Sequence, residues 1–121
     1  MISCEAWRRT GGFDESFFLY CEDVDWCIRA RAESVDLVII EEELAEHIGG
    51  ASTTRDGDAV WAYWWARNRL RLARKHGEGS ITRIALRQLV SASRQVVVAP
   101  RNSAIGVARM RGVWAGIRTH A

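Results

Sequence analysis

Three carboxylates lie close together in the sequence Glu22-Asp23-Val24-Asp25, and grouped carboxylates can carry out proton transfer. The apolar residues that follow recur at helical spacing, so we predict a helix that begins near Glu22. Its first turn would hold all three acids, where unpaired N–H groups and the helix dipole favour negative charge. Helix capping alone would also explain acids at this position. The residue types therefore leave a catalytic and a capping interpretation open.

Other residues must position this acidic cluster. Gly11 and Gly12 predict a tight turn, because glycine adopts backbone angles that other residues avoid. The bulky residues 17–20 (Phe-Phe-Leu-Tyr) predict a short buried extended segment before the helix. Residues 36–40 (Asp-Leu-Val-Ile-Ile) are β-branched and apolar, which predicts a strand buried on both faces within a sheet.

A longer pattern surrounds the cluster. Residues 11–30 read Gly-Gly-Phe-Asp-Glu-x-Phe-Phe-Leu-Tyr-x-Glu-Asp-Val-Asp-Trp-Cys-x-Arg-Ala. This run resembles the second half of the family 2 glycosyltransferases, particularly the bacterial rhamnosyltransferase-like members. The resemblance continues through residues 47–50 (His-Ile-Gly-Gly) and 63–70 (Tyr-Trp-Trp-Ala-Arg-Asn-Arg-Leu), and it covers about residues 3 to 76 in order.

The resemblance implies a fold and a reaction. The fold is α/β: residues 1–56 would form the C-terminal, acceptor-side half of a Rossmann-like GT-A catalytic domain, and residues 57–121 a region of amphipathic helices. The reaction is transfer of a sugar, with inversion, from a nucleotide-sugar donor to a hydroxyl acceptor. Such acceptors, some of them lipid-linked, belong to the synthesis of cell-surface polysaccharide or glycolipid.

The resemblance also implies roles for the acidic cluster. Asp23 matches the catalytic base, which would take the proton from the acceptor hydroxyl. Glu22 and Asp25 would orient the acceptor or the base. Trp26 either lines the acceptor pocket or packs in the core, and the sequence favours neither.

Three further residues are implied to bind donor or metal. His47 resembles a ligand of the divalent ion, Mn²⁺ or Mg²⁺, that holds the donor diphosphate in the complete enzyme. From spacing alone, a single histidine after a strand is more often structural or exposed than a metal ligand. Arg67 and Asn68 match a recurrent pair of the family, and Arg67 is expected to face the diphosphate or the acceptor.

The donor-binding part of the family pattern is not recognisable in this sequence. Its metal-binding Asp-x-Asp motif has no counterpart, because residues 23–25 belong to the acidic cluster and residues 56–58 read as a polar turn. We therefore expect a C-terminal fragment in which metal binding is weak or absent and which is inactive in isolation. The alternative is a non-catalytic remnant or a membrane-binding helical module.

Charge is distributed unevenly along the chain. Residues 1–66 hold 5 basic and 14 acidic residues, a net charge of −9, whereas residues 67–121 hold 12 and 1, a net charge of +11. The second half should therefore meet an anionic partner, or the two halves attract each other. Amphipathic helices predicted over residues 59–76, from Ser80 to Pro100, and over residues 103–118 fit an anionic membrane surface or a hairpin packed on its own domain. No nucleic-acid reading motif is present, so a nucleic-acid partner is not expected.

Bulk properties fit one globular domain. The chain has 121 residues, of which 48% are hydrophobic, and it contains no apolar run of the roughly 20 residues that span a bilayer. Its three cysteines fit neither a zinc knuckle nor a redox pair. Free thiols predict a reducing, cytoplasmic location, with peripheral attachment to the inner face of the plasma membrane if the basic helices bind lipid.

Overall fold

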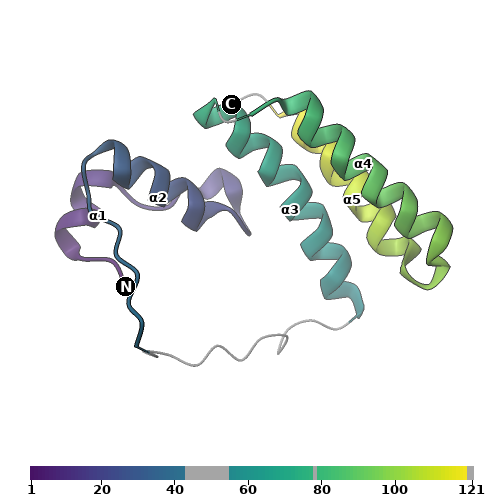
Figure 1. Cartoon of the computed structure of the whole chain (residues 1–121), viewed down its shortest axis with the longest axis horizontal. Coiled ribbons are helices and arrows are strands. Elements are labelled where there is room, and N and C mark those ends of the chain that lie inside the picture. Colours follow the sequence, from purple (N-terminus) through teal and green to yellow (C-terminus); the bar gives the residue numbers. More distant parts are fainter. Residues whose placement is uncertain (43–54, 78, 120–121) are drawn as a thin grey trace.

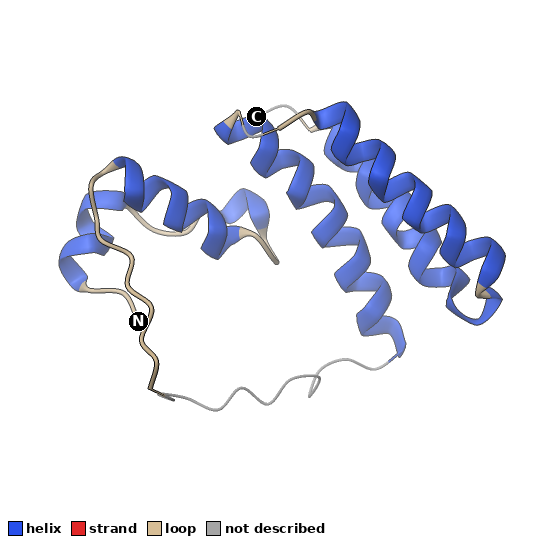
Figure 2. Cartoon of the chain, in the orientation of Figure 1, coloured by secondary structure: helices blue, strands red, loops and turns tan. Residues whose placement is uncertain are grey.

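The computed structural model describes residues 1–42, 55–77 and 79–119. Within these ranges every regular element is a helix, and no strand is present (Figure 2). The α-helices are α1 (Cys4–Thr10), α2 (Glu22–Ala32), α3 (Arg55–His76), α4 (Ile81–Val98) and α5 (Ser103–Arg118). Two short 3₁₀ turns, η1 (Glu15–Phe17) and η2 (Pro100–Asn102), precede α2 and α5.

The predicted α/β fold, half of a Rossmann-like GT-A domain, is therefore wrong for the described residues. Residues 17–20 do not extend, because Phe18 and Tyr20 turn the backbone with φ angles of 57° and 66°. Residues 36–40 form neither a helix nor a strand, and no other segment in the described part of the chain pairs with them. They are exposed instead of buried on both faces, and Ile39 is 93% exposed. A strand without a neighbouring strand cannot bury its polar backbone.

The helices predicted over residues 59–76, from Ser80 to Pro100 and over residues 103–118 agree better with the structure, although α3 begins earlier, at Arg55. Ser80 caps α4 by accepting a hydrogen bond from the backbone N–H of Arg83 at 3.3 Å. The last helix runs from Ser103 to Arg118 as predicted, and Gly77, with φ 67°, directly follows α3. Side-chain caps and a glycine with positive φ are local signals, and they explain why these ends were predictable.

Helix α3 lies in the middle of the molecule, with α4 and α5 on one side and α1 and α2 on the other (Figure 1). Helices α3, α4 and α5 are held together by a small apolar core of Ala66 and Leu70 from α3, Ala85 from α4 and Val113 from α5. Helix α5 also presents buried glycines to its neighbours: Gly106 faces α4, and Gly112 and Gly116 face α3. Without Cβ atoms, these glycines let the helix backbones approach closely.

The N-terminal side has two small cores. Ala6 of α1 packs against Trp26 and Ala30 of α2. Phe17 and the buried Cys21 pack against Leu72, so this second core reaches α3. The predicted boundary between residues 56 and 57 falls within α3, and the division into two functional regions stays a prediction. None of the helices in the described ranges is long and apolar enough to cross a bilayer.

Candidate functional site

The turn that leads into α2 is held by one buried side chain of α3. The amide nitrogen of Asn68 donates hydrogen bonds to the carbonyl oxygens of Phe17, Leu19 and Tyr20, at 2.6, 2.7 and 2.9 Å. Arg67 donates to the carbonyl oxygen of Ser16 at 3.1 Å and to Oδ1 of Asn68 at 2.6 Å. The Arg67-Asn68 pair therefore does for this turn what a neighbouring strand would do for an extended segment: it supplies the backbone carbonyls with donors.

This turn needs such support because its backbone is strained. Phe18, Tyr20 and Cys21 have φ angles of 57°, 66° and 70°. For residues with a Cβ, such angles cost about 1–2 kcal/mol each. The hydrogen bonds from Asn68 offset that cost and set the point at which α2 begins. Burial raises the pKa of the Cys21 thiol to about 11, so this thiol stays protonated near neutral pH.

We expect Asn68→Ala to lower the free energy of unfolding by about 2–3 kcal/mol, because the carbonyls of the strained turn lose their shared donor. Urea unfolding followed by circular dichroism measures this loss. Asn102→Ala is a suitable control, because Asn102 is exposed and its side chain makes no capping bond to α5. Equal stability of the two variants would contradict the proposed support of the turn.

Asp25 is fully buried and forms the centre of an ion-pair network. One of its carboxylate oxygens accepts from Arg29 at 2.9 Å, and the other lies 2.8 Å from both Lys75 and Nε2 of His76. Lys75 also pairs with Asp14 at 2.7 Å. Two acids of the first half, Asp14 and Asp25, thus pair with Lys75 and His76 of the second half.

Both of these carboxylates titrate below their ordinary range. Burial by itself would raise the pKa of Asp25, but hydrogen bonds from Lys75, His76 and Arg29 outweigh it and lower that pKa. Burial is likewise outweighed at Asp14, where bonds to Lys75 and to Ser16 lower the pKa. Both side chains are therefore negatively charged at neutral pH.

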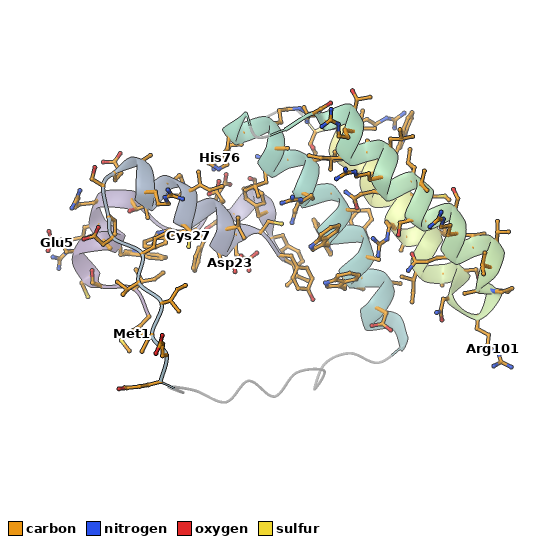
Figure 3. All side chains as sticks on the ribbon, viewed as in Figure 1. Met1, Glu5, Asp23, Cys27, His76 and Arg101 are labelled. Carbon is orange, nitrogen blue, oxygen red and sulfur yellow. The ribbon has the colours of Figure 1, made fainter. Side chains whose placement is uncertain are left out.

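Asp23 differs from Asp25 in its exposure and in its partners. It is exposed, and its Oδ1 accepts a hydrogen bond only from the adjacent backbone N–H of Val24, at 2.8 Å, among the described residues. It lines a cleft of about 480 Å³, together with Trp26 and Asp36, to which α2, residues 35–40 and the N-terminal residues contribute. Figure 3 labels Asp23 on α2 and His76 on α3. A carboxylate placed in this way can reach a ligand.

Glu22 and Trp26 occupy intermediate positions. Oε2 of Glu22 is shielded from solvent and has no hydrogen-bond partner in the described part of the chain. Trp26 is 4% exposed, and its indole nitrogen donates to the carbonyl oxygen of Gly11 at 2.9 Å. The same ring packs in the core and forms part of the cleft wall, so both roles considered for Trp26 are compatible with its position.

The structure brings Asp23 and Trp26 together at the cleft, and it directs Asp25 away from the cleft into the ion-pair network. Arg67 and Asn68 hold the turn, and a direct contact of either with substrate stays a prediction. His47 lies outside the described residues. Within those residues, no three His, Cys, Asp or Glu side chains come close enough to hold a metal ion. Because His47 lies outside the part of the chain that the structure describes, the implied Mn²⁺ or Mg²⁺ site of the complete enzyme stays a prediction.

Sequence reasoning missed the residues that support the site. Arg29, Lys75 and His76 were not singled out, although all three bind Asp25. The spacing of Asp25 and Arg29, four residues apart on one helix, was a usable signal for an ion pair. Lys75 and His76 could not be found in this way, because they lie about fifty residues further along the chain.

Comparison with known proteins adds a functional relationship. No protein-family model matches the chain, and no solved structure matches it. Among curated proteins, the chain is similar to the low-salt glycan biosynthesis hexosyltransferase Agl10 of Haloferax volcanii, with 32% identity over 84 residues. The match covers 69% of this chain but only 27% of that relative. This similarity supports a relationship to glycosyltransferases, and the chain spans about a quarter of the length of the relative it matches.

Proposed function

We propose that this chain forms the acceptor side of a nucleotide-sugar-dependent glycosyltransferase of the family 2 type, with Asp23 as the general base. The observation that carries the proposal is the contrast within the acidic cluster. Asp25 is buried and ion-paired, whereas Asp23 is exposed at a cleft and has no ion-pair partner in the described residues. The similarity to a hexosyltransferase favours a hexosyl group as the transferred unit.

In this proposal, the acceptor hydroxyl enters the cleft beside Asp23. The carboxylate takes the hydroxyl proton as the oxygen attacks the anomeric carbon of the donor, and the nucleotide diphosphate leaves from the opposite face. The configuration at the anomeric carbon is therefore inverted. Trp26 contributes an apolar side chain to the wall of the same cleft.

Two other residues would act on Asp23 from a distance. Asn68 fixes the strained turn that precedes α2, and Asp25 ties α2 to the end of α3. We regard both as positioning residues, because neither lines the cleft that holds Asp23. Their substitution should reduce activity only as far as it disturbs the fold.

The chain matches about a quarter of its relative, so in this proposal the donor-binding part lies in another segment or another polypeptide. We expect no measurable turnover from the 121-residue chain alone. The test therefore uses a chimera, in which the matching segment of the Haloferax volcanii hexosyltransferase is replaced by that of this chain. We expect the chimera to transfer hexose from a nucleotide-sugar panel, and Asp23→Asn to lower the transfer rate roughly 100-fold through loss of the base.

Two control variants make the outcome decisive. Glu33→Gln removes an exposed carboxylate from the end of α2, and Asp36→Asn removes the other carboxylate at the cleft. Both should retain activity. A folded chimera in which Asp23→Asn transfers sugar as fast as the parent would overturn the role of Asp23. A folded chimera that binds donor and transfers nothing would overturn the proposed function.

A further inference from the structure

A second cavity, separate from the cleft of Asp23, lies between α3 and the beginning of α4. It has a volume of about 330 Å³ and is lined by three arginines, Arg69 from α3 and Arg83 and Arg87 from α4. Gly79 and Ser80 also line it, so the N-terminus of α4 opens on the same cavity. Guanidinium groups and the N–H groups of a helix N-terminus are both donors suited to phosphate oxygens.

The charge of these arginines is not neutralised within the described part of the protein. Every ion pair found there uses Asp14 or Asp25 as its acid. Residues 79–121 contain seven arginines and no acidic residue. Three like charges around one small cavity repel one another, and a bound anion would relieve this repulsion. The cavity therefore has the charge, the donors and the size for a phosphate group.

A shallow groove continues from this cavity along α4. Arg87 lines both, and the groove goes on past Val90, Arg94 and Val98 with a volume of about 470 Å³. Val90 and Val98 are exposed, Val98 to 79%. This combination of a charged cavity and an apolar groove suits an amphiphilic ligand. Its phosphate group would enter the cavity, and its first methylene groups would lie on the two valines.

We propose that the cavity of Arg69, Arg83 and Arg87 binds the phosphate headgroup of an anionic membrane lipid, and that it docks α4 on a membrane surface. A phosphate monoester suits three arginines better than a diester does, because it offers three oxygens to forked donors. The apolar groove beside the cavity favours a lipid over a free phosphate. The proposal goes beyond glycosyl transfer and does not depend on it, since none of these residues lies in the cleft of Asp23.

The test is co-sedimentation of the full chain with phosphatidylcholine vesicles that contain either phosphatidic acid or phosphatidylserine. We expect tighter binding to phosphatidic acid, and at least roughly tenfold weaker binding of the triple variant R69Q/R83Q/R87Q. The matched control R8Q/R101Q/R111Q loses the same charge from exposed positions outside the cavity. Arg101, for example, projects from the turn between α4 and α5 (Figure 3). The control should keep most of the binding.

Two further measurements distinguish a lipid phosphate from a free phosphate compound as the ligand. Val90→Ser with Val98→Ser should weaken vesicle binding and leave the binding of inorganic pyrophosphate, followed by calorimetry, unchanged. Equal losses in the two triple variants would overturn the cavity as a site, since unspecific attraction would then suffice. Binding of pyrophosphate without binding of any vesicle would overturn the lipid assignment. All of these residues are exposed, so thermal unfolding should be unaltered in each variant.

Discussion

Asp25→Asn is expected to lower the free energy of unfolding by about 3–5 kcal/mol. The buried side chain at this position then carries no charge, while Lys75, His76 and Arg29 still surround it. The side chain of Asp25 has no exposed surface, whereas its three partners are partly exposed. Urea unfolding at neutral pH measures the loss. Asp23→Asn is the matched control: the same change on the same helix, at an exposed carboxylate, should alter stability by about 0.5 kcal/mol or less.

The same pair of variants predicts a pH dependence. Because the pKa of Asp25 is lower in the folded protein, the ionised carboxylate stabilises the fold above the ordinary value of 3.8. That contribution disappears as the pH falls from this value through the lower pKa of the folded state. The difference in stability between wild type and Asp25→Asn should therefore shrink below about pH 4. A difference that stays constant into acid would mean that Asp25 is not charged in the fold.

Gly112→Leu should abolish the packing of α5 on α3, at a cost of about 4 kcal/mol or more. Even a Cβ atom at this position would overlap the carbonyl oxygen of Tyr63, and it would lie 3.0 Å from the Cβ of Ala66. Because the obstacle is backbone, a change of rotamer cannot relieve the clash. At Gly116, an added Cβ would meet the carbonyl oxygen of Arg67 at 2.8 Å, so the close approach extends over a full turn of α5.

The measurement is thermal unfolding with circular dichroism, supported by tryptophan fluorescence. Arg111→Leu serves as control, because Arg111 is the exposed neighbour of Gly112 on the same helix. We expect the control to keep the melting temperature within a few degrees. Gly112→Ala should give an intermediate loss, since its clash is smaller and alanine favours helix over glycine. A stable Gly112→Leu protein would show that α5 does not approach α3 as closely as described.

Much of the helical structure was predictable, because its signals are local. Ser80 and Gly77 mark helix ends through their own backbone and side chains, and α5 has the predicted bounds, residues 103 to 118. The prediction failed where a segment depends on distant partners. Residues 36–40 have the composition of a strand, yet composition does not say whether a second strand lies beside them. We predicted a sheet from the resemblance to the family 2 glycosyltransferases, and the described residues do not form one.

In the candidate site, too, local features were predictable and contacts with distant residues were not. The acidic cluster was found from residue type and from its place at the start of α2. Its internal division was not predictable, because Asp23 and Asp25 are both acids of the same helical turn. Only the position of Lys75 and His76 at the end of α3 makes one a structural anchor and leaves the other accessible. Asn68 was singled out through the family pattern, but its three bonds to the turn could be seen only in three dimensions.

Adjacent residues of α3 contact opposite sides of the protein. The carbonyl oxygen of Arg67 lies against Gly116 of α5, while the side chain of Asn68 donates hydrogen bonds to the turn before Asp23. The packing of α5 and the position of the acidic cluster at the start of α2 therefore depend on the same stretch of α3.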